Sequence, residues 1–190
     1  MTVRKIPLIT PIALSSVPNH ESIKSDLMDL INESDARRIK DDNYAWSLDI
    51  TRCDYDDHMD GSPRKWVDFV RPHLVPIIKE IHEELGFKTL DVHKIWFQQY
   101  DTDSVHGWHM HTQCQWTSVY YVDLPEGTPQ TEILNPFTQN DVQTLEVKEG
   151  DVIMFPSYVI HQAPTNKGVD TKTIISWNSS ADIEPGYEIQ

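Results

Sequence analysis

The sequence predicts an α+β fold in which helices near the N-terminus support a jelly-roll barrel of short strands. Up to about residue 87, apolar residues recur with the period of a helix. From residue 88 onward the apolar segments become short, and Gly, Pro, Asn and Asp separate them, as is typical of antiparallel sheets. Helices followed by a run of short strands favour a barrel packed on helices.

The length of 190 residues suffices for one domain with a sizeable core. No repeat, linker or low-complexity segment divides the chain. We therefore expect a single domain with three parts: a mainly helical support over residues 1–87, a β core over 88–180 and a polar tail over 181–190.

The first elements are weakly marked. Residues 1–18 are rich in proline and partly apolar, which predicts an edge strand and a loop. Asn19 is a good helix N-cap residue, and apolar residues at helical spacing follow it as far as Ile31. Residues 45–50 alternate like a short strand, and the acidic stretch 54–60 reads as a solvated surface loop.

The second helix is the more strongly marked of the two. Ser62 and Pro63 match an N-cap followed by a proline in the first helical position. An apolar stripe then continues at helical spacing until Gly86, which is a typical stop signal. Pro72 and Pro76 fall inside this stripe, so we expect them to kink or split the helix.

The strands of the β core are short and rich in β-branched and aromatic residues, which are the residues that pleated sheets favour. Turn-forming residues bound each of them. We expect six strands, over residues 92–100, 116–122, 143–147, 152–155, 159–162 and 172–177.

Charge and hydropathy narrow the classes of partner. The formal net charge of -14 disfavours nucleic acid and anionic membrane surfaces, both of which attract basic proteins. The apolar stretches are too short to span a bilayer, and no signal peptide is visible. A cytoplasmic setting follows as the expectation, with Cys53 and Cys114 as thiols. The sequence sets no oligomeric state.

Three histidines form a candidate metal site. His109 and His111 are two residues apart, so on a strand their side chains point to the same face. His161 follows a glycine turn, a buried apolar strand and a proline, and a third imidazole from a distant strand completes a set of ligands on one face of a metal. His106 has the opposite parity, which predicts that it lies outside the site.

Lys172 marks a second candidate binding position. If residues 172–178 form a strand, Lys172 shares one face with Ile174, Ser176 and Asn178. A lysine that begins a buried strand is costly to bury unless an anion meets it. A dicarboxylate that also chelates the metal would supply that anion. The alternative is a lysine whose stem is buried and whose ammonium reaches solvent.

Together these segments resemble the 2-oxoglutarate and Fe(II)-dependent oxygenases, in the branch near the prolyl 4-hydroxylases whose first motif reads H-x-H. The resemblance covers roughly residues 92–180, and it depends on the order of several motifs that are individually weak. The matching segments are His109-Met110-His111, Ser118-Val119-Tyr120-Tyr121, Gly150-Asp151-Val152-Ile153-Met154-Phe155-Pro156-Ser157, His161 and Lys172-Thr173-Ile174-Ile175-Ser176-Trp177-Asn178.

The resemblance implies a double-stranded β-helix, which is a jelly-roll and cupin-like barrel, and an Fe(II) site. His109 and His161 would be iron ligands, and His111 would occupy the position that is Asp in the commoner H-x-D motif. Alternatively, His111 does not bind the iron itself and two histidines and water molecules are the ligands, or an acid such as Asp103 completes the site.

The resemblance also implies the cosubstrate and the reaction. Lys172 would pair with the distal carboxylate of 2-oxoglutarate, and Tyr121 would donate a hydrogen bond to the same carboxylate. Ser176 and Asn178 would line the pocket. The enzyme would consume O2 and hydroxylate a small molecule or peptide, with proline as one candidate residue.

Two other readings stay open. A cupin-type dioxygenase with three histidine ligands would use no 2-oxoglutarate, and His109, His111, Gly150, Pro156 and His161 fit much of the cupin pattern. A jelly-roll domain that uses its histidines for a structural metal or a ligand would be a binding module without catalysis.

Overall fold

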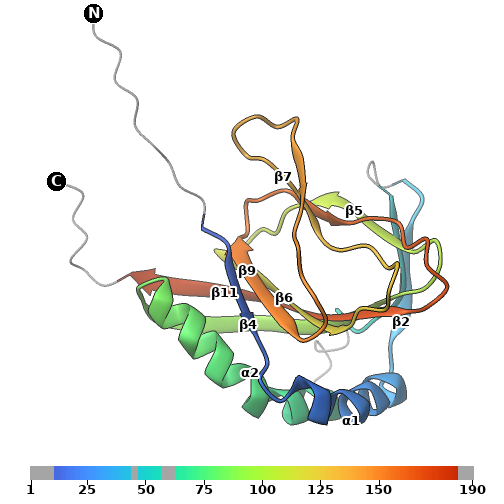
Figure 1. Ribbon diagram of the computed structural model, residues 1–190, viewed down its shortest axis with the longest axis horizontal. Helices are drawn as coiled ribbons and strands as arrows, with labels where there is room; N and C mark the ends of the chain where they lie inside the picture. Colours follow the sequence, from blue (N-terminus) through green and yellow to red (C-terminus); the bar gives the residue numbers. More distant parts are fainter. Residues whose placement is uncertain (1–10, 44–46, 57–62, 184–190) are drawn as a thin grey trace, which may run out of the picture.

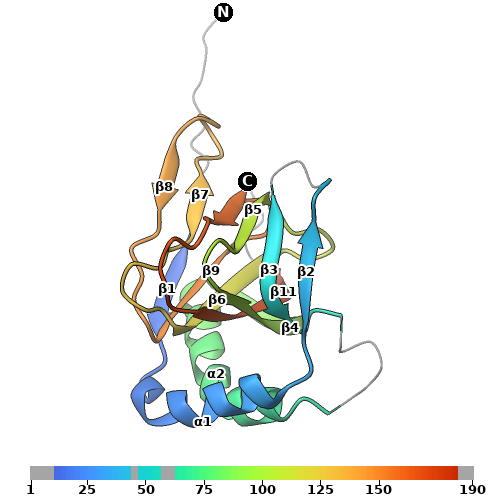
Figure 2. The same cartoon turned by 90° about the vertical axis from the view of Figure 1, so that its right-hand side faces the viewer.

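The computed structural model describes residues 11–43, 47–56 and 63–183. In these ranges, two helices lie under a curved sheet whose strands curl into an open barrel, as Figures 1 and 2 show. This arrangement confirms the predicted α+β double-stranded β-helix supported by helices. The strands are β1 (Ala13–Ser16), β2 (Arg37–Asp41), β3 (Leu48–Cys53), β4 (Phe87–Tyr100), β5 (Val105–His109), β6 (Trp116–Asp123), β7 (Glu132–Leu134), β8 (Val142–Thr144), β9 (Asp151–Pro156), β10 (His161–Ala163) and β11 (Lys172–Ile183).

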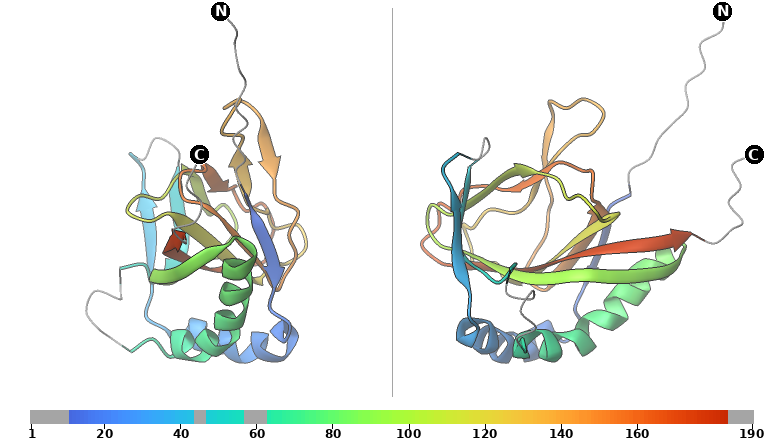
Figure 3. Two further views of the ribbon diagram at one scale, coloured as in Figure 1. Left: turned by 90° about the vertical axis from the view of Figure 1, so that its left-hand side faces the viewer. Right: turned by 180° about the vertical axis from the view of Figure 1, so that it is seen from behind.

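The strand order is β1-β9-β6-β11-β4-β3-β5-β10-β7-β8, with β2 paired to β3, and every pairing is antiparallel. The last strand, β11, therefore lies in the middle of the sheet between β6 and β4. The β7–β8 hairpin projects on the side away from the helices, and β2 and β3 stand along one side of the barrel, where β3 pairs with β4 and β5 (Figures 2 and 3). β1 pairs only with β9, so the edge strand predicted within residues 1–18 is confirmed over its described part.

Helix α1 (His20–Glu33) begins after Asn19, as its sequence predicts. The Asn19 side chain makes no cap bond, however, and its Nδ2 donates instead to Nδ1 of His73 at 2.9 Å. This bond joins the start of α1 to the second helix, so tertiary contact replaces the local cap.

Helix α2 (Lys65–Glu84) is continuous through Pro72 and Pro76, so the expected split does not occur. The helix begins two residues later than predicted, with Arg64 at the N-cap and Pro63 outside it, while Ser62 lies outside the described residues. Gly86 ends the helix with φ +71°, a conformation that glycine adopts without strain.

The central strands bury side chains on both faces and so separate two cores. The face toward the helices carries Phe97 of β4, Tyr120 of β6 and Trp177 of β11, which pack with Trp66, Val70 and Leu27 of the helices. The face inside the barrel carries Trp96, Tyr121 and Ile174, together with Ile153 and Phe155 of β9. The alternation predicted for residues 172–178 is therefore confirmed, and the barrel interior is a separate, partly polar compartment.

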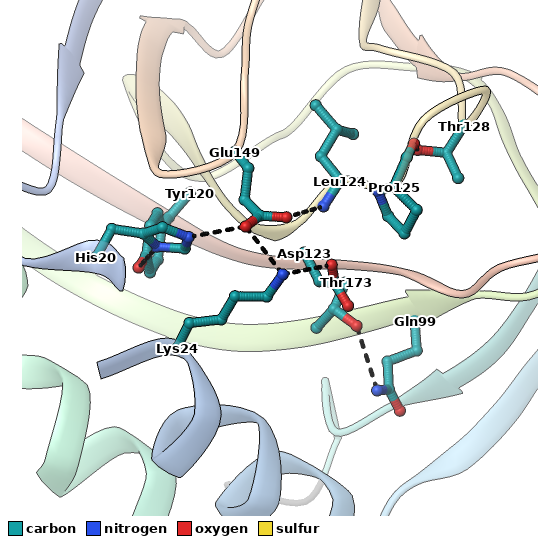
Figure 4. A network of polar contacts seen from close by, with 10 residues as sticks. All are labelled: His20, Lys24, Gln99, Tyr120, Asp123, Leu124, Pro125, Thr128, Glu149 and Thr173. Carbon is teal, nitrogen blue, oxygen red and sulfur yellow. Dashed lines mark hydrogen bonds and ion pairs between the residues drawn. The ribbon is translucent and has the colours of Figure 1, made fainter. Parts of the chain in front are cut away.

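A polar network fastens α1 to the barrel (Figure 4). Lys24 Nζ lies 2.9 Å from both Asp123 Oδ1 and Glu149 Oε1. His20 bonds Tyr120 through Nδ1 at 2.7 Å and Glu149 through Nε2 at 3.3 Å. Because both ring nitrogens of His20 and both oxygens of Glu149 are engaged, this cluster is a structural network rather than an open ligand site.

The sequence missed several short or polar strands. β2 and β7 were not expected, the strand assumed for His109 and His111 ends at His109 as β5, and β4 begins at Phe87 rather than at residue 92. Residues 88–93 of β4 are mostly exposed because β4 and β11 continue past the barrel, over α2. An exposed strand has no apolar alternation to reveal it. In the part of the chain that the structure describes, no helix is long and apolar enough to cross a membrane.

Candidate metal centre

Three histidine rings meet inside the barrel, as the sequence predicts. His109 ends β5, His111 follows it in a loop, and His161 begins β10, where it pairs directly with His109. One ring nitrogen from each histidine lies within 4.8 Å of the other two. The rings are 4.2 to 5.3 Å apart between centroids, and His161 is 5% exposed.

Hydrogen bonds fix the same orientation in all three rings. The Nδ1–H groups donate to the Gly107 carbonyl at 2.7 Å from His109, to Asn178 Oδ1 at 2.7 Å from His111 and to the Val159 carbonyl at 2.9 Å from His161. In a neutral imidazole, Nε2 is then the nitrogen with the lone pair. The structure therefore presents three Nε2 lone pairs, each backed by an oxygen acceptor, which is the usual arrangement around a bound metal.

Burial keeps these histidines neutral. Desolvation lowers the pKa of His109 to about 4, and it lowers the pKa values of His111 and His161 as well. The neutral form is the one that binds metals, so no proton has to leave at neutral pH.

His106 lies beside this cluster, contrary to the parity argument. Its ring stacks on His109 with centroids 3.7 Å apart and an interplanar angle of 9°. The cause is a bulge in β5. His161 pairs with His109 and Ala163 pairs with His106, so the two paired positions are three residues apart on β5 but two residues apart on β10. A bulge of one residue reverses the alternation, and His106 turns to the inside.

No carboxylate of the described residues joins the three histidines. Asp103, the acid considered as an alternative ligand, is 74% exposed and pairs with Lys167 at 2.8 Å. That alternative is therefore wrong, and His111 stands in the cluster itself, where its bond to Asn178 orients it.

Lys172 is buried at the other end of the barrel interior, with 1% of its surface exposed. Its Nζ donates to the Pro129 carbonyl at 2.7 Å and lies 5.2 Å from the centroid of the Tyr100 ring. Burial lowers the pKa of Lys172 to about 7, and no carboxylate in the described residues forms an ion pair with it. The alternative in which the ammonium of Lys172 reaches solvent is therefore excluded, and the buried amine could accept an anion as its partner.

Tyr121 and Thr131 lie near this end of the interior. The Tyr121 hydroxyl donates to Thr131 Oγ1 at 2.6 Å, and burial raises its pKa. A cavity of about 30 Å³ separates this region from the histidines, and its lining includes Thr131, Tyr100, Ser176 and Thr117. The Thr117 hydroxyl is buried in the wall of this cavity.

A second cavity, of about 530 Å³, opens from the histidines toward solvent. Its volume lies in the range of small-molecule sites. Apolar and aromatic side chains of β2, β3 and β4 form much of its wall. The residues that line it are Ile39, Leu48, Ile50, Cys53, Tyr55, Asp56, Trp96, Gln98, His106, His109, Met110, His111, Thr112 and Asn178.

The three predicted histidines line the small cavity, whereas Lys172 and Tyr121 line neither cavity, and some neighbours of the site were missed. Ser176 lines the small cavity and Asn178 the large one. Thr117 has the same strand parity as Tyr121, so parity alone pointed to it. Gln98 likewise has the parity of Trp96 and Tyr100 on β4, whereas His106 carries no such signal because a bulge reverses its alternation.

No protein-family model matches the chain, and no curated protein matches its sequence. Solved structures do match. An oxidoreductase of the 2OG-Fe(II) oxygenase family from Burkholderia pseudomallei aligns at TM-score 0.70 and 10% identity, over 89% of this chain and 84% of that one.

Two further similar structures have equally low identity. The epimerase SnoN from nogalamycin biosynthesis, in complex with Fe3+, alpha ketoglutarate and nogalamycin RO, aligns at TM-score 0.66 and 12% identity, over 90% of this chain and 78% of that one. A Pseudomonas putida prolyl-4-hydroxylase aligns at TM-score 0.58 and 12% identity, over 89% and 92%. At these identities the likeness establishes the fold that the chain shares with them.

Proposed function

We propose that the chain is a non-haem Fe(II) dioxygenase that couples the oxidative decarboxylation of 2-oxoglutarate to the hydroxylation of a substrate. The observation that carries the proposal is that three oriented imidazoles and a buried amine, which pairs with no carboxylate of the described residues, lie inside the same barrel. A bound metal would account for the three imidazoles, and a dicarboxylate would account for the buried amine. Either ligand alone would account for only one of these features.

The residues present fit the metal. His109, His111 and His161 would hold iron(II) through Nε2, because each Nδ1–H is already donated to an oxygen. Imidazole nitrogens suit iron among other metals. With 2-oxoglutarate, bound iron supplies the activation of O2: the cosubstrate and O2 give succinate and CO2, and a substrate C–H becomes C–OH.

The residues present also fit the cosubstrate. Lys172 would hold its distal carboxylate, which supplies the anion that the buried amine lacks. The Tyr121 hydroxyl would turn from Thr131 and donate to the same carboxylate, and Ser176 would line the pocket beside it. The present space of about 30 Å³ admits roughly two water molecules, so the side chains around it must move apart when 2-oxoglutarate enters.

Asn178 lines the large cavity and has a second role. Its Oδ1 accepts the Nδ1–H of His111, so we assign it to the orientation of that ligand. The large cavity would hold the substrate, a small molecule or a peptide residue such as proline. Residues 88–180 would form the catalytic barrel and residues 1–87 its support, in one domain.

The all-histidine donor set favours a second candidate, a three-histidine dioxygenase that uses no 2-oxoglutarate. Lys172 argues against it, because such an enzyme supplies no anion to the buried amine, whose hydrogen-bond partner is the neutral Pro129 carbonyl. A non-catalytic binding module would likewise leave Lys172 unexplained.

One experiment separates these candidates. Anaerobic protein loaded with Fe(II) is mixed with 2-oxoglutarate, O2 is admitted, and succinate and O2 consumption are measured. Slow succinate release without added substrate supports the proposal, and amino acids, peptides and cell extract are then screened for faster release. If calorimetry detects no 2-oxoglutarate binding and no succinate forms, the proposal fails. O2 consumption without 2-oxoglutarate favours the three-histidine enzyme.

A further inference from the structure

A fourth histidine, His106, has a tautomer opposite to that of the three candidate ligands. Gln98 Nε2 lies 3.4 Å from His106 Nδ1. An amide nitrogen can only donate, so His106 Nδ1 accepts this bond, and the ring proton is on Nε2. In His109, His111 and His161 the proton is on Nδ1 instead.

The tautomer determines what each ring can do. An imidazole with a proton on Nε2 and an engaged Nδ1 has no lone pair for a metal, so His106 is excluded from the ligand set although it touches that set. Its ring nevertheless lies parallel to His109 at 3.7 Å between centroids. The other two rings beside His109 are less parallel or more distant: His161 lies at 4.2 Å and 52°, and His111 lies at 5.3 Å and 29°.

We infer that His106 is a positioning residue: it holds the plane of the His109 ring by stacking, and Gln98 holds His106 itself in the non-ligating tautomer. His106 also lines both cavities, so its Nε2–H is available to a hydrogen-bond acceptor bound next to the metal. The inference rests on the proposed metal site, because it assigns the work of His106 to a ligand of that site.

The first test reads tautomers in the metal-free protein and needs no activity. Long-range ¹H–¹⁵N correlation spectra of the histidine rings distinguish Nδ1–H from Nε2–H, and variants that lack one histidine each assign the signals. We expect Nε2–H for His106 and Nδ1–H for His109. Nδ1–H for His106 would overturn the inference. In Gln98→Leu the single His106 tautomer should give way to a mixture, and an unchanged Nε2–H signal would exclude Gln98 as its cause.

The second test measures metal affinity by calorimetry with Co(II). His106→Ala should bind about tenfold to a hundredfold more weakly, as is usual when support behind a ligand is removed. His106→Phe keeps an aromatic ring against His109, so its affinity should stay within about threefold of the unmodified protein. Equal losses in both variants, or a loss in neither, would contradict stacking as the role of His106.

His93→Ala is the matched control, because His93 is exposed on β4 and bonds Ser180, away from the cluster. It should bind Co(II) as the unmodified protein does. If the unmodified protein binds no Co(II), the proposed metal site fails by itself. The tautomer spectrum then still shows whether Gln98 sets the state of His106.

Discussion

Replacing Lys172 by methionine should change how the stability of the protein depends on pH. Burial lowers the pKa of this amine from 10.5 to about 7. Between these values the folded protein holds the amine uncharged, while the unfolded chain holds it as ammonium. One pKa unit corresponds to about 1.4 kcal/mol, so burial of Lys172 costs the ligand-free fold on the order of 5 kcal/mol below pH 7.

The sign follows from the protons bound. Between pH 7 and 10 the unfolded chain binds one more proton at this residue, so the free energy of unfolding rises with pH by about 1.4 kcal/mol per unit. Below pH 7 both states are protonated and the slope disappears. Lys172→Met has no such group, so its stability advantage should be largest below pH 7 and should shrink steadily toward pH 10.

The assay is urea unfolding followed by tryptophan fluorescence at pH 6, 7, 8 and 9, for the unmodified protein, Lys172→Met and the exposed control Lys88→Met. At each pH only the difference in unfolding free energy between two proteins is used, because the contributions of the other titrating groups then cancel. Added succinate should stabilise the unmodified protein and leave Lys172→Met unchanged. A difference in stability that stays flat from pH 6 to 9 would refute the buried, unpaired amine and with it the anion site.

Three other outcomes are expected. His161→Ala should abolish Co(II) binding in calorimetry, and near-normal affinity would remove His161 from the ligand set. Tyr121→Phe should weaken 2-oxoglutarate about tenfold to a hundredfold, the worth of a hydrogen bond to a charged group, with metal affinity unchanged; equal affinity for the cosubstrate would leave Tyr121 bonded to Thr131 alone. Burial raises the pKa of Glu149, but hydrogen bonds, first from Lys24, lower it to about 2. The stability that this shift contributes is present above about pH 4.5 and is lost as pH falls through about 2. Lys24→Met should therefore flatten the acid limb of the stability curve, and an identical limb would mean that Lys24 contributes nothing there.

Strand parity accounts for most of what the sequence could predict about the site. It placed Ile174 and Ser176 on the barrel face, and the order of motifs brought His161 to His109. It failed at His106, because nothing in the residue pattern reveals a bulge that forms only against β10.

Local sequence signals also predicted the helix boundaries only in part. Asn19 ends up at the N-cap, but the partner of its side chain is His73 on another helix. Asp103 was plausible as a ligand from its distance along the chain alone, and its surface ion pair with Lys167 depends on a turn that the sequence does not specify. Contacts between residues that only the tertiary structure brings together cannot be predicted from local sequence patterns.

The position of β11 in the sheet has a consequence for how the protein is made. This strand follows β4 and β6 along the chain and is therefore synthesised after both, yet it pairs with each of them at the centre of the sheet. Until it arrives, β4 and β6 present unpaired inner edges, which are templates for aggregation. Pairings across some 80 residues of chain also fold slowly. Lys172 and Asn178 both lie on β11. The candidate metal centre and the anion site can therefore form only after β11 has paired with β4 and β6.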